Sequence, residues 1–272
     1  MASKRVAVVT GSNKGIGLAI VRSLCKKFDG DVILTSRDEG RGKEAVKQLK
    51  EKESLNPVYH QLDITNAQSI EGLVTFVKDT YGGLDVLINN AGIAYKSAST
   101  APDLEQATVT MATNFTATLN ISRAFFPLLR PGARVVNVAS FTGKLSKYGP
   151  AVKAKFTDPN LTEAGLVSLM EEYISVIREG KASELGWNNT KYGTSKTAVI
   201  ALSKIHAKEL AASDKKDILV NSCCPGWVKT DMAGDRAPLT PDEGAVTPVT
   251  CALLPPGSPN GEFWRDQKVS EW

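Results

Sequence analysis

The stretch RVAVVTGSNKGIGLAIVRSLCKKF, residues 5–28, decides the fold. It begins with a short apolar run typical of a buried strand and continues into a pattern typical of an amphipathic helix. Between the two lie Gly11, Gly15 and Gly17. Glycines at such a turn let the backbone approach a ligand closely, and the start of the helix offers free N–H groups to a pyrophosphate. The stretch therefore predicts the first strand, the first helix and the phosphate cradle of a dinucleotide-binding fold.

The rest of the chain repeats this alternation of strand and helix. Five further apolar runs are predicted to be strands, and most are continuous, as expected when both faces of a sheet are buried. They are DVILTS at 31–36, VYHQL at 58–62, LDVLIN at 84–89, ARVVNVA at 133–139 and DILVNS at 217–222. Helical patterns lie between them. This order predicts an α/β fold of the Rossmann type, a doubly wound parallel sheet with helices on both faces, in one domain over residues 1–272.

Composition and charge exclude several classes of function. The 272 residues are 42% hydrophobic and 23% charged, and the net charge is +4. Basic residues form pairs rather than a patch, so nucleic acid is not expected as a partner. No apolar run approaches the roughly 18 residues of a membrane span, and the start shows no signal-peptide pattern. The four cysteines have no zinc-binding or CxxC spacing, so we expect reduced thiols in a cytoplasmic protein.

The end of the second predicted strand indicates which dinucleotide is bound. An acidic residue there would bind the ribose 2′-hydroxyl of NAD. Here Arg37 lies 20 residues after Gly17, and a guanidinium suits a 2′-phosphate. Lys14, inside the glycine turn, could reach the same phosphate. The two cations favour NADPH, although they could also be ordinary solvated charges, and Asp38 beside Arg37 keeps NAD open.

A phenol and an amine lie four residues apart in KYGTSK, at Tyr192 and Lys196. On a helix, residues at this spacing share one face. The ammonium of Lys196 is expected to lower the pKa of the phenol from its usual value near 10, which would suit Tyr192 to exchange a proton with a substrate. By itself, however, a Tyr and a Lys at this spacing are more often two ordinary neighbours on a helix surface.

Three motifs taken together resemble the short-chain dehydrogenase/reductase family: TGSNKGIG after the first strand, NNAG at 89–92 and YxxxK at 192–196. The resemblance runs over nearly the whole chain from Val6. Segments such as LVNSCCPGWVKTDMAG resemble the monomeric NADPH-dependent carbonyl reductases within that family. The resemblance implies reduction of aldehydes, ketones and quinones with NADPH. Two alternatives stay open: an NADPH-binding regulatory protein without catalysis, and a reductase dedicated to one biosynthetic ketone.

The resemblance also assigns roles to individual residues. The catalytic set that it implies is Asn114, Ser140, Tyr192 and Lys196, of which Tyr192 is the acid. Ser140 would hold the substrate oxygen and Asn114 would position a water, while Lys196 would also bind the nicotinamide ribose. Besides Tyr192 and Lys196, the implied cofactor contacts are Gly11, Asn13, Lys14, Gly15, Ile16, Gly17, Arg37, Asp63, Ile64, Asn89, Ala91, Gly92, Pro225, Gly226, Trp227, Val228 and Thr230. The implied substrate pocket is lined by Ser140, Phe141 and Trp227.

The chain departs from the common family pattern before YxxxK. Ser140 and Tyr192 are 52 residues apart, so an insertion of roughly residues 149–190 is expected. A helix near 162–179, starting at Asn160 or Thr162 and ending at Gly180, is predicted from an apolar stripe at helical spacing: Leu166, Leu169, Met170, Tyr173, Ile174 and Ile177. We expect the stripe to pack on its own chain and to cover the usual dimer face, leaving a monomer. The alternative is that it forms a new dimer interface.

The remaining reactive side chains are interpreted as structural. His60 and His206 have no acidic partner at a ligand spacing, so no metal site is expected. Cys223 and Cys224 are expected to pack at the end of a strand, with a reactive thiol as the alternative.

Overall fold

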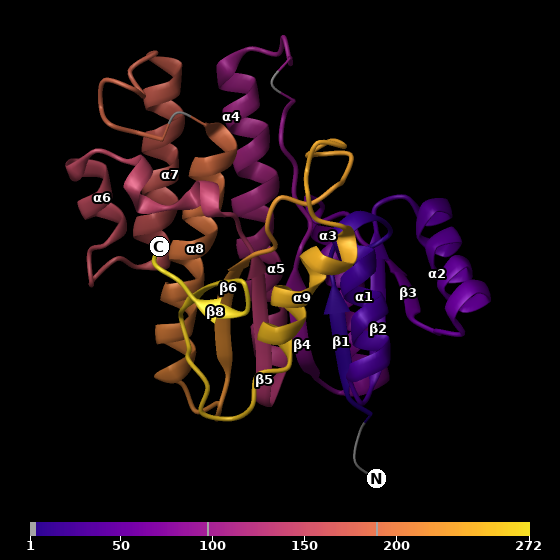
Figure 1. Ribbon diagram of the computed structural model, residues 1–272. Coiled ribbons are helices and arrows are strands. Elements are labelled where there is room, and N and C mark those ends of the chain that lie inside the picture. Colours follow the sequence, from indigo (N-terminus) through magenta and orange to yellow (C-terminus); the bar gives the residue numbers. More distant parts are fainter. Residues whose placement is uncertain (1–3, 97, 189) are drawn as a thin grey trace.

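The computed structural model describes residues 4–96, 98–188 and 190–272. Its strands are β1 (Val6–Val9), β2 (Asp31–Ser36), β3 (Val58–Gln61), β4 (Leu84–Asn89), β5 (Leu129–Val138), β6 (Leu219–Cys224), β7 (Phe263–Arg265) and β8 (Lys268–Val269). They form one sheet in the order β3-β2-β1-β4-β5-β6-β7-β8 (Figure 1). The pairs from β3 to β7 are parallel, and β8 alone is antiparallel. The predicted α/β class is confirmed, but the short β7–β8 hairpin was not predicted, because five residues carry no clear periodicity.

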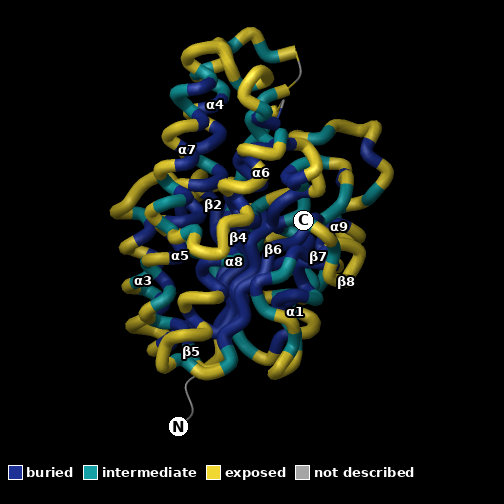
Figure 2. Tube along the Cα trace, turned by 90° about the vertical axis from the view of Figure 1, so that its left-hand side faces the viewer, coloured by how far each residue is buried: buried dark blue, intermediate teal, exposed yellow. Residues whose placement is uncertain are grey.

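Helices cover both faces of the sheet. One face packs against α1 (Gly15–Lys27), α2 (Glu39–Glu53) and α9 (Pro241–Ala252). The other face packs against α3 (Ala67–Tyr81), α5 (Ala117–Phe125) and α8 (Lys191–Ala211). The strands between them form the buried centre of the molecule (Figure 2). This double coverage explains why the predicted strands are continuous apolar runs rather than alternating ones.

The strand order reverses between β1 and β4, which are neighbours in the sheet although two strands separate them in sequence. In open α/β sheets, ligands bind beyond the carboxyl ends of the strands at such a reversal. The glycine turn follows β1 and the NNAG motif begins at the end of β4, so both lie at this point.

The inserted segment forms α6 (Pro150–Phe156) and α7 (Glu163–Arg178) outside the main layers (Figure 1). Thr162 caps α7, since its hydroxyl accepts from the Gly165 N–H at 3.1 Å, and Gly180 follows the helix end with φ +71°. Helix α7 packs on α8 and on α4 (Asp103–Met111). The predicted stripe is therefore largely right, and Val176 is buried where Ile174 and Ile177 are only half-buried.

Cys223 and Cys224 end strand β6 and are buried, as predicted. Burial raises the pKa of both thiols, which keeps them protonated at neutral pH and disfavours the reactive-thiol alternative. Within the described part of the chain, none of the helices combines the length and the apolar character needed to cross a membrane.

Candidate active site

The glycine turn after β1 is built for close approach. Gly11 and Gly15 have φ angles of +60° and +56°, in the left-handed region that favours glycine. A Cβ on Gly11 would lie 2.8 Å from the Cβ of Ala91, and a Cβ on Gly17 would lie 2.5 Å from the Gly11 carbonyl oxygen. The turn is thus pressed against the segment that follows β4, and no larger residue fits there.

Asn90 holds this turn in place, a role that the sequence analysis missed. Its side-chain amide donates to the carbonyl oxygens of Thr10 and Gly11 at 3.0 and 3.1 Å. The Thr10 hydroxyl accepts in return from the backbone N–H groups of Asn90 and Ala91, both at 3.0 Å. The signal was present in sequence, because the second Asn of NNAG directly follows the end of a buried strand.

The N-terminus of α1 fits an anionic ligand. No side chain caps it, and its first turn has no acidic residue. Free N–H groups and the positive end of the helix dipole therefore face the glycine turn, which suits a pyrophosphate. Gly15, Ile16 and Gly17, three of the expected cofactor contacts, form this first turn.

The end of β2 favours a 2′-phosphate over a free ribose hydroxyl. Arg37 is exposed, and its backbone carbonyl is fixed by the Gln61 side chain at 3.0 Å. The Asp38 carboxylate caps α2 by accepting from the Arg41 N–H at 2.7 Å. The sequence left NAD as an alternative cofactor because of Asp38, but in the structure this carboxylate serves as the cap of α2. Arg41 lines a hollow together with Asn13 and was not predicted.

Lys14 does not face this hollow. Its ammonium pairs at 2.6 Å with Asp231, which lies in the loop that follows β6. Gly15 also lies close to this loop: a Cβ added to Gly15 would be 3.3 Å from the Thr230 Cγ2. The predicted role of Lys14 at the 2′-phosphate would require it to leave Asp231, an exposed partner that holds it weakly.

The residues expected near the adenine lie at the ends of β3 and β4. Burial disfavours ionised Asp63, but hydrogen bonds from Thr65 and the charge of Arg37 outweigh it and lower the pKa of its carboxyl. Ile64 is buried beside it. Asn89 is only 4% exposed, and its amide donates to Asn137 at 2.8 Å inside the protein. Its Oδ1 is an orphaned buried acceptor among the described residues.

Asn114 lies in a π-helical turn, Ala112–Thr116, that joins α4 to α5. Such turns are rare and frequently mark functional sites. Its side chain is tied to Ile93 by two hydrogen bonds of 2.8 and 2.9 Å and donates to Ser195 at 2.9 Å. A Cβ on Gly92 would lie 3.1 Å from the Asn114 Oδ1 and 3.5 Å from the Lys196 Nζ, so both polar groups flank one small space.

Tyr192 and Lys196 lie on the first turns of α8, with the ammonium 5.6 Å from the centre of the phenol ring. Burial lowers the pKa of Lys196 to about 8, and its Nζ donates to the Val138 carbonyl at 2.7 Å. Burial also raises the pKa of Tyr192 to about 12, which the Cys224 thiol reinforces and the Ser140 hydroxyl partly offsets. The predicted lowering by Lys196 is therefore wrong here: exclusion of water has the largest effect on the phenol, and it raises the pKa.

Ser140 follows β5 and begins a short turn, Phe141–Gly143. Its hydroxyl accepts from the Thr142 N–H at 3.2 Å and from the Thr142 hydroxyl at 3.0 Å. The structure thus brings Ser140, Tyr192 and Lys196 to one place. The Ser140 hydroxyl is close enough to the Tyr192 phenol to affect its pKa, and Lys196 donates to the carbonyl of Val138, two residues before Ser140.

The sequence of this site fits a known family. A model described as short chain dehydrogenase matches residues 5–154 and 180–239. The chain belongs to the short-chain dehydrogenase family. The unmatched residues 155–179 contain α7, which is part of the predicted insertion.

Relatives of this short-chain dehydrogenase share its whole length. It is 51% identical to a protein of Rattus norvegicus named carbonyl reductase (NADPH) 1, over 100% of both chains, and 50% identical to the human protein of that name, over 98% of both. Among solved structures, salutaridine reductase from Papaver somniferum has a TM-score of 0.87 at 31% identity, covering 97% of this chain and 100% of its own. An NADPH-bound carbonyl reductase from chicken fatty liver has a TM-score of 0.72 at 26% identity, covering both chains fully.

The loop after β6 supplies the last expected residues of this short-chain dehydrogenase. Pro225 is half-buried, and Gly226 has φ +89°. Val228 is buried, whereas Trp227 is 50% exposed. Phe141 is also exposed and carries the Arg265 guanidinium 5.5 Å from its ring centre. Both rings thus lie exposed at the carboxyl side of the sheet, where the resemblance implies the substrate pocket.

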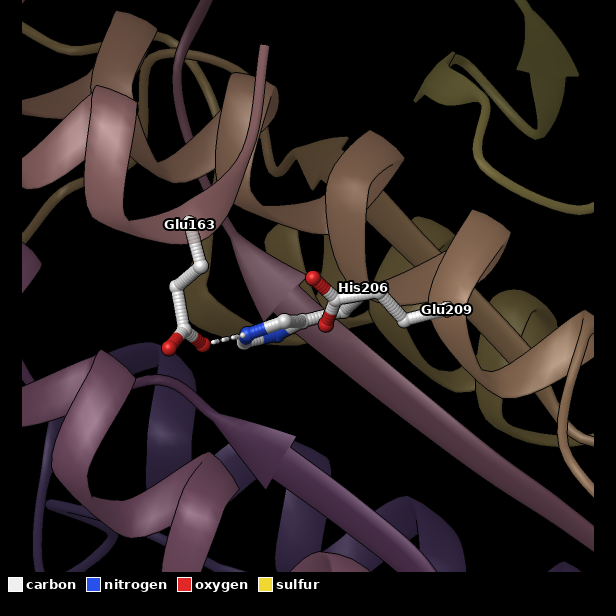
Figure 3. Close-up of side chains that lie close together, drawn as sticks. All are labelled: Glu163, His206 and Glu209. Atoms are coloured by element: carbon white, nitrogen blue, oxygen red, sulfur yellow. Dashed lines mark hydrogen bonds and ion pairs between the residues drawn. The ribbon is translucent and has the colours of Figure 1, made fainter. Parts of the chain in front are cut away.

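A second polar cluster joins the insertion to the main fold (Figure 3). The ligand atoms of Glu163, His206 and Glu209 lie within 4.8 Å of one another, so the sequence analysis was wrong that His206 lacks acidic neighbours. Both carboxylate oxygens of Glu163 already have partners: one forms an ion pair with Arg123 at 2.6 Å, and the other is hydrogen-bonded to His206 at 2.7 Å. These contacts attach the start of α7 to α5 and α8. Burial lowers the pKa of His206, although Glu163 opposes this.

Proposed function

We propose that the protein is an NADPH-dependent carbonyl reductase that reduces aldehydes, ketones and quinones. The observation that carries the proposal is the placement of half-buried Tyr192 and buried Lys196 beside Ser140, because it combines a proton donor, a charge and a hydroxyl at one point. The proposal is supported by the rat and human carbonyl reductases, whose sequences are 51% and 50% identical to this chain over nearly its whole length.

The residues present fit NADPH. The glycine turn and the uncapped start of α1 would hold the pyrophosphate, and Arg37 would hold the 2′-phosphate. Lys196 and Tyr192 would hold the nicotinamide ribose. When bound, NADPH supplies the hydride that reduces the carbonyl carbon.

Each catalytic side chain then has a task at the carbonyl oxygen. Tyr192 is a protonated phenol at neutral pH, since its pKa lies near 12, and donates its proton as negative charge develops on that oxygen. Ser140 holds the same oxygen with its hydroxyl. Lys196, whose pKa lies near 8, is mostly charged at pH 7 and stabilises the tyrosinate that remains. Asn114 holds the water through which Lys196 exchanges protons with solvent.

A substrate panel tests the proposal. Purified protein with NADPH should oxidise the cofactor, seen as loss of its absorbance, in the presence of quinones and aromatic aldehydes. Prostaglandin-like and cyclic terpenoid ketones complete the panel. Binding of NADPH without turnover of any carbonyl would favour the alternative of a catalytically idle regulatory protein.

A reductase dedicated to one biosynthetic ketone is the second candidate. The TM-score to salutaridine reductase, 0.87, exceeds that to the chicken carbonyl reductase, 0.72, and favours this candidate. The 51% sequence identity to the rat carbonyl reductase favours an enzyme with many carbonyl substrates. The panel separates the two, because a dedicated enzyme prefers one ketone strongly, and quinones and simple aldehydes compete poorly with it.

We also propose a cytoplasmic location and small-molecule partners only. Support for the location comes from the cysteines: Cys25, Cys223, Cys224 and Cys251 are all free thiols. Chains without disulfides are typical of reducing compartments.

The protein is expected to be a monomer in solution. The apolar side of α7 packs on α4 and α8 of its own chain, so it covers the face that the resemblance implies for dimers. Light scattering at micromolar concentration should give a mass near 29.2 kDa. A mass of twice this value would instead support the alternative in which the insertion forms a dimer interface.

A further inference from the structure

The turn that carries Ser140 is tied to the other end of the sequence. The Trp272 indole Nε1–H donates to the Gly143 carbonyl oxygen at 3.0 Å. The Gly143 N–H in turn donates to the Ser140 carbonyl oxygen at 3.0 Å. Two hydrogen bonds therefore link Trp272 to Ser140 through one short turn.

This turn rests directly on α8. A Cβ on Gly143 would lie 2.8 Å from the Lys196 carbonyl carbon and 2.8 Å from the Thr197 nitrogen. The Thr197 hydroxyl also lies 3.0 Å from the Gly143 carbonyl oxygen, but its single hydrogen is shared with the Gly193 carbonyl oxygen, which is at the same distance. The Trp272 N–H is therefore the undivided donor to that oxygen among these two. With the backbone of the turn already in contact with α8, the Trp272 donor fixes how the turn is oriented on the helix.

Trp272 is itself well anchored. Its ring packs against a buried cluster that contains Ala139, the residue before Ser140, and Ile200 of α8. The Lys204 ammonium lies 5.8 Å from the ring centre and donates to the Gly261 carbonyl at 2.9 Å. A rigid donor of this kind can hold its acceptor in one position.

We propose that Trp272 is a positioning residue for carbonyl reduction: it holds the Phe141–Gly143 turn so that the Ser140 hydroxyl meets the substrate oxygen. The inference rests on the proposed function. A hydrogen bond weakens steeply when its distance or angle changes, and the bond from Ser140 matters most when charge develops on the oxygen. Releasing the turn should therefore slow the chemical step more than it weakens binding.

The test is Trp272→Phe, which keeps an aromatic ring and removes the N–H donor. We expect kcat/KM for a quinone to fall about fivefold, mainly through kcat, while the Kd for NADPH is unchanged. Trp264→Phe is the matched control. The Trp264 Nε1 is buried and has no partner among the described residues, so the same replacement there breaks no hydrogen bond. Its kcat/KM should stay within about twofold of the wild type.

A double-mutant cycle decides whether Trp272 acts through Ser140. In a Ser140→Ala background, Trp272→Phe should cause no further loss, since the hydroxyl that it positions is gone. An equal loss in both backgrounds, together with a lower Tm, would overturn the proposal in favour of a general structural role. Full kcat in Trp272→Phe would also overturn it. A wild type that reduces no carbonyl would instead contradict the proposed function.

Discussion

Replacing Tyr192 by Phe is expected to lower kcat/KM for carbonyl reduction by about 10²–10⁴-fold, the usual contribution of a positioned proton donor. The ring remains, so the packing of α8 should change little, and NADPH should still bind because the glycine turn and Arg37 would hold its phosphates. Burial keeps the phenol protonated at neutral pH, and the proton that Tyr192 holds is then the one lost in the variant. Initial rates with a quinone or an aromatic aldehyde measure the change.

Tyr173→Phe is the matched control for this experiment. Tyr173 is fully buried on α7, and its hydroxyl has no hydrogen-bond partner within the part of the chain that the structure describes. The same atom is removed, but outside the catalytic set, so near-wild-type rates are expected. If Tyr192→Phe kept more than half of the wild-type rate, Tyr192 would not be the proton donor.

The second large effect concerns the choice of cofactor. We expect the wild type to prefer NADPH over NADH by at least tenfold in kcat/KM, because a hydrogen bond to a charged group contributes about 1.5–3 kcal/mol. We attribute most of this preference to Arg37. Lys14 is already paired with Asp231, and Asp38 caps α2 rather than offering its carboxylate to the ribose of NAD. Arg37→Asp should remove the preference by repelling the 2′-phosphate.

Lys47→Asp is the control for the change in charge. Lys47 is exposed on α2, close to Arg37 in sequence, and its replacement alters the net charge by the same amount. Its cofactor ratio should match that of the wild type. Equal efficiencies with both cofactors in the wild type would refute the role of Arg37, as would an unchanged ratio in Arg37→Asp.

Local patterns in the sequence were sufficient for the framework of the molecule. The glycine turn, the buried strands and the helix with Tyr192 and Lys196 on one face each depend on spacing within a few residues. Such spacing reports directly which side of an element is buried. The inserted helix was predicted for the same reason, from its stripe and from Thr162 as its start.

The sequence by itself thus determined strands β1 to β6, their order along the chain and the residue types that meet at the carboxyl ends of the strands. Only the tertiary structure decided what surrounds those residues. It placed Lys14 against Asp231, which is 217 positions away, and Trp272 against Gly143, which is 129 positions away. It also reversed the expected pKa shift of Tyr192, because exclusion of water depends on every element packed around α8. Burial and long-range partners are properties of the assembled fold, and no local pattern encodes them.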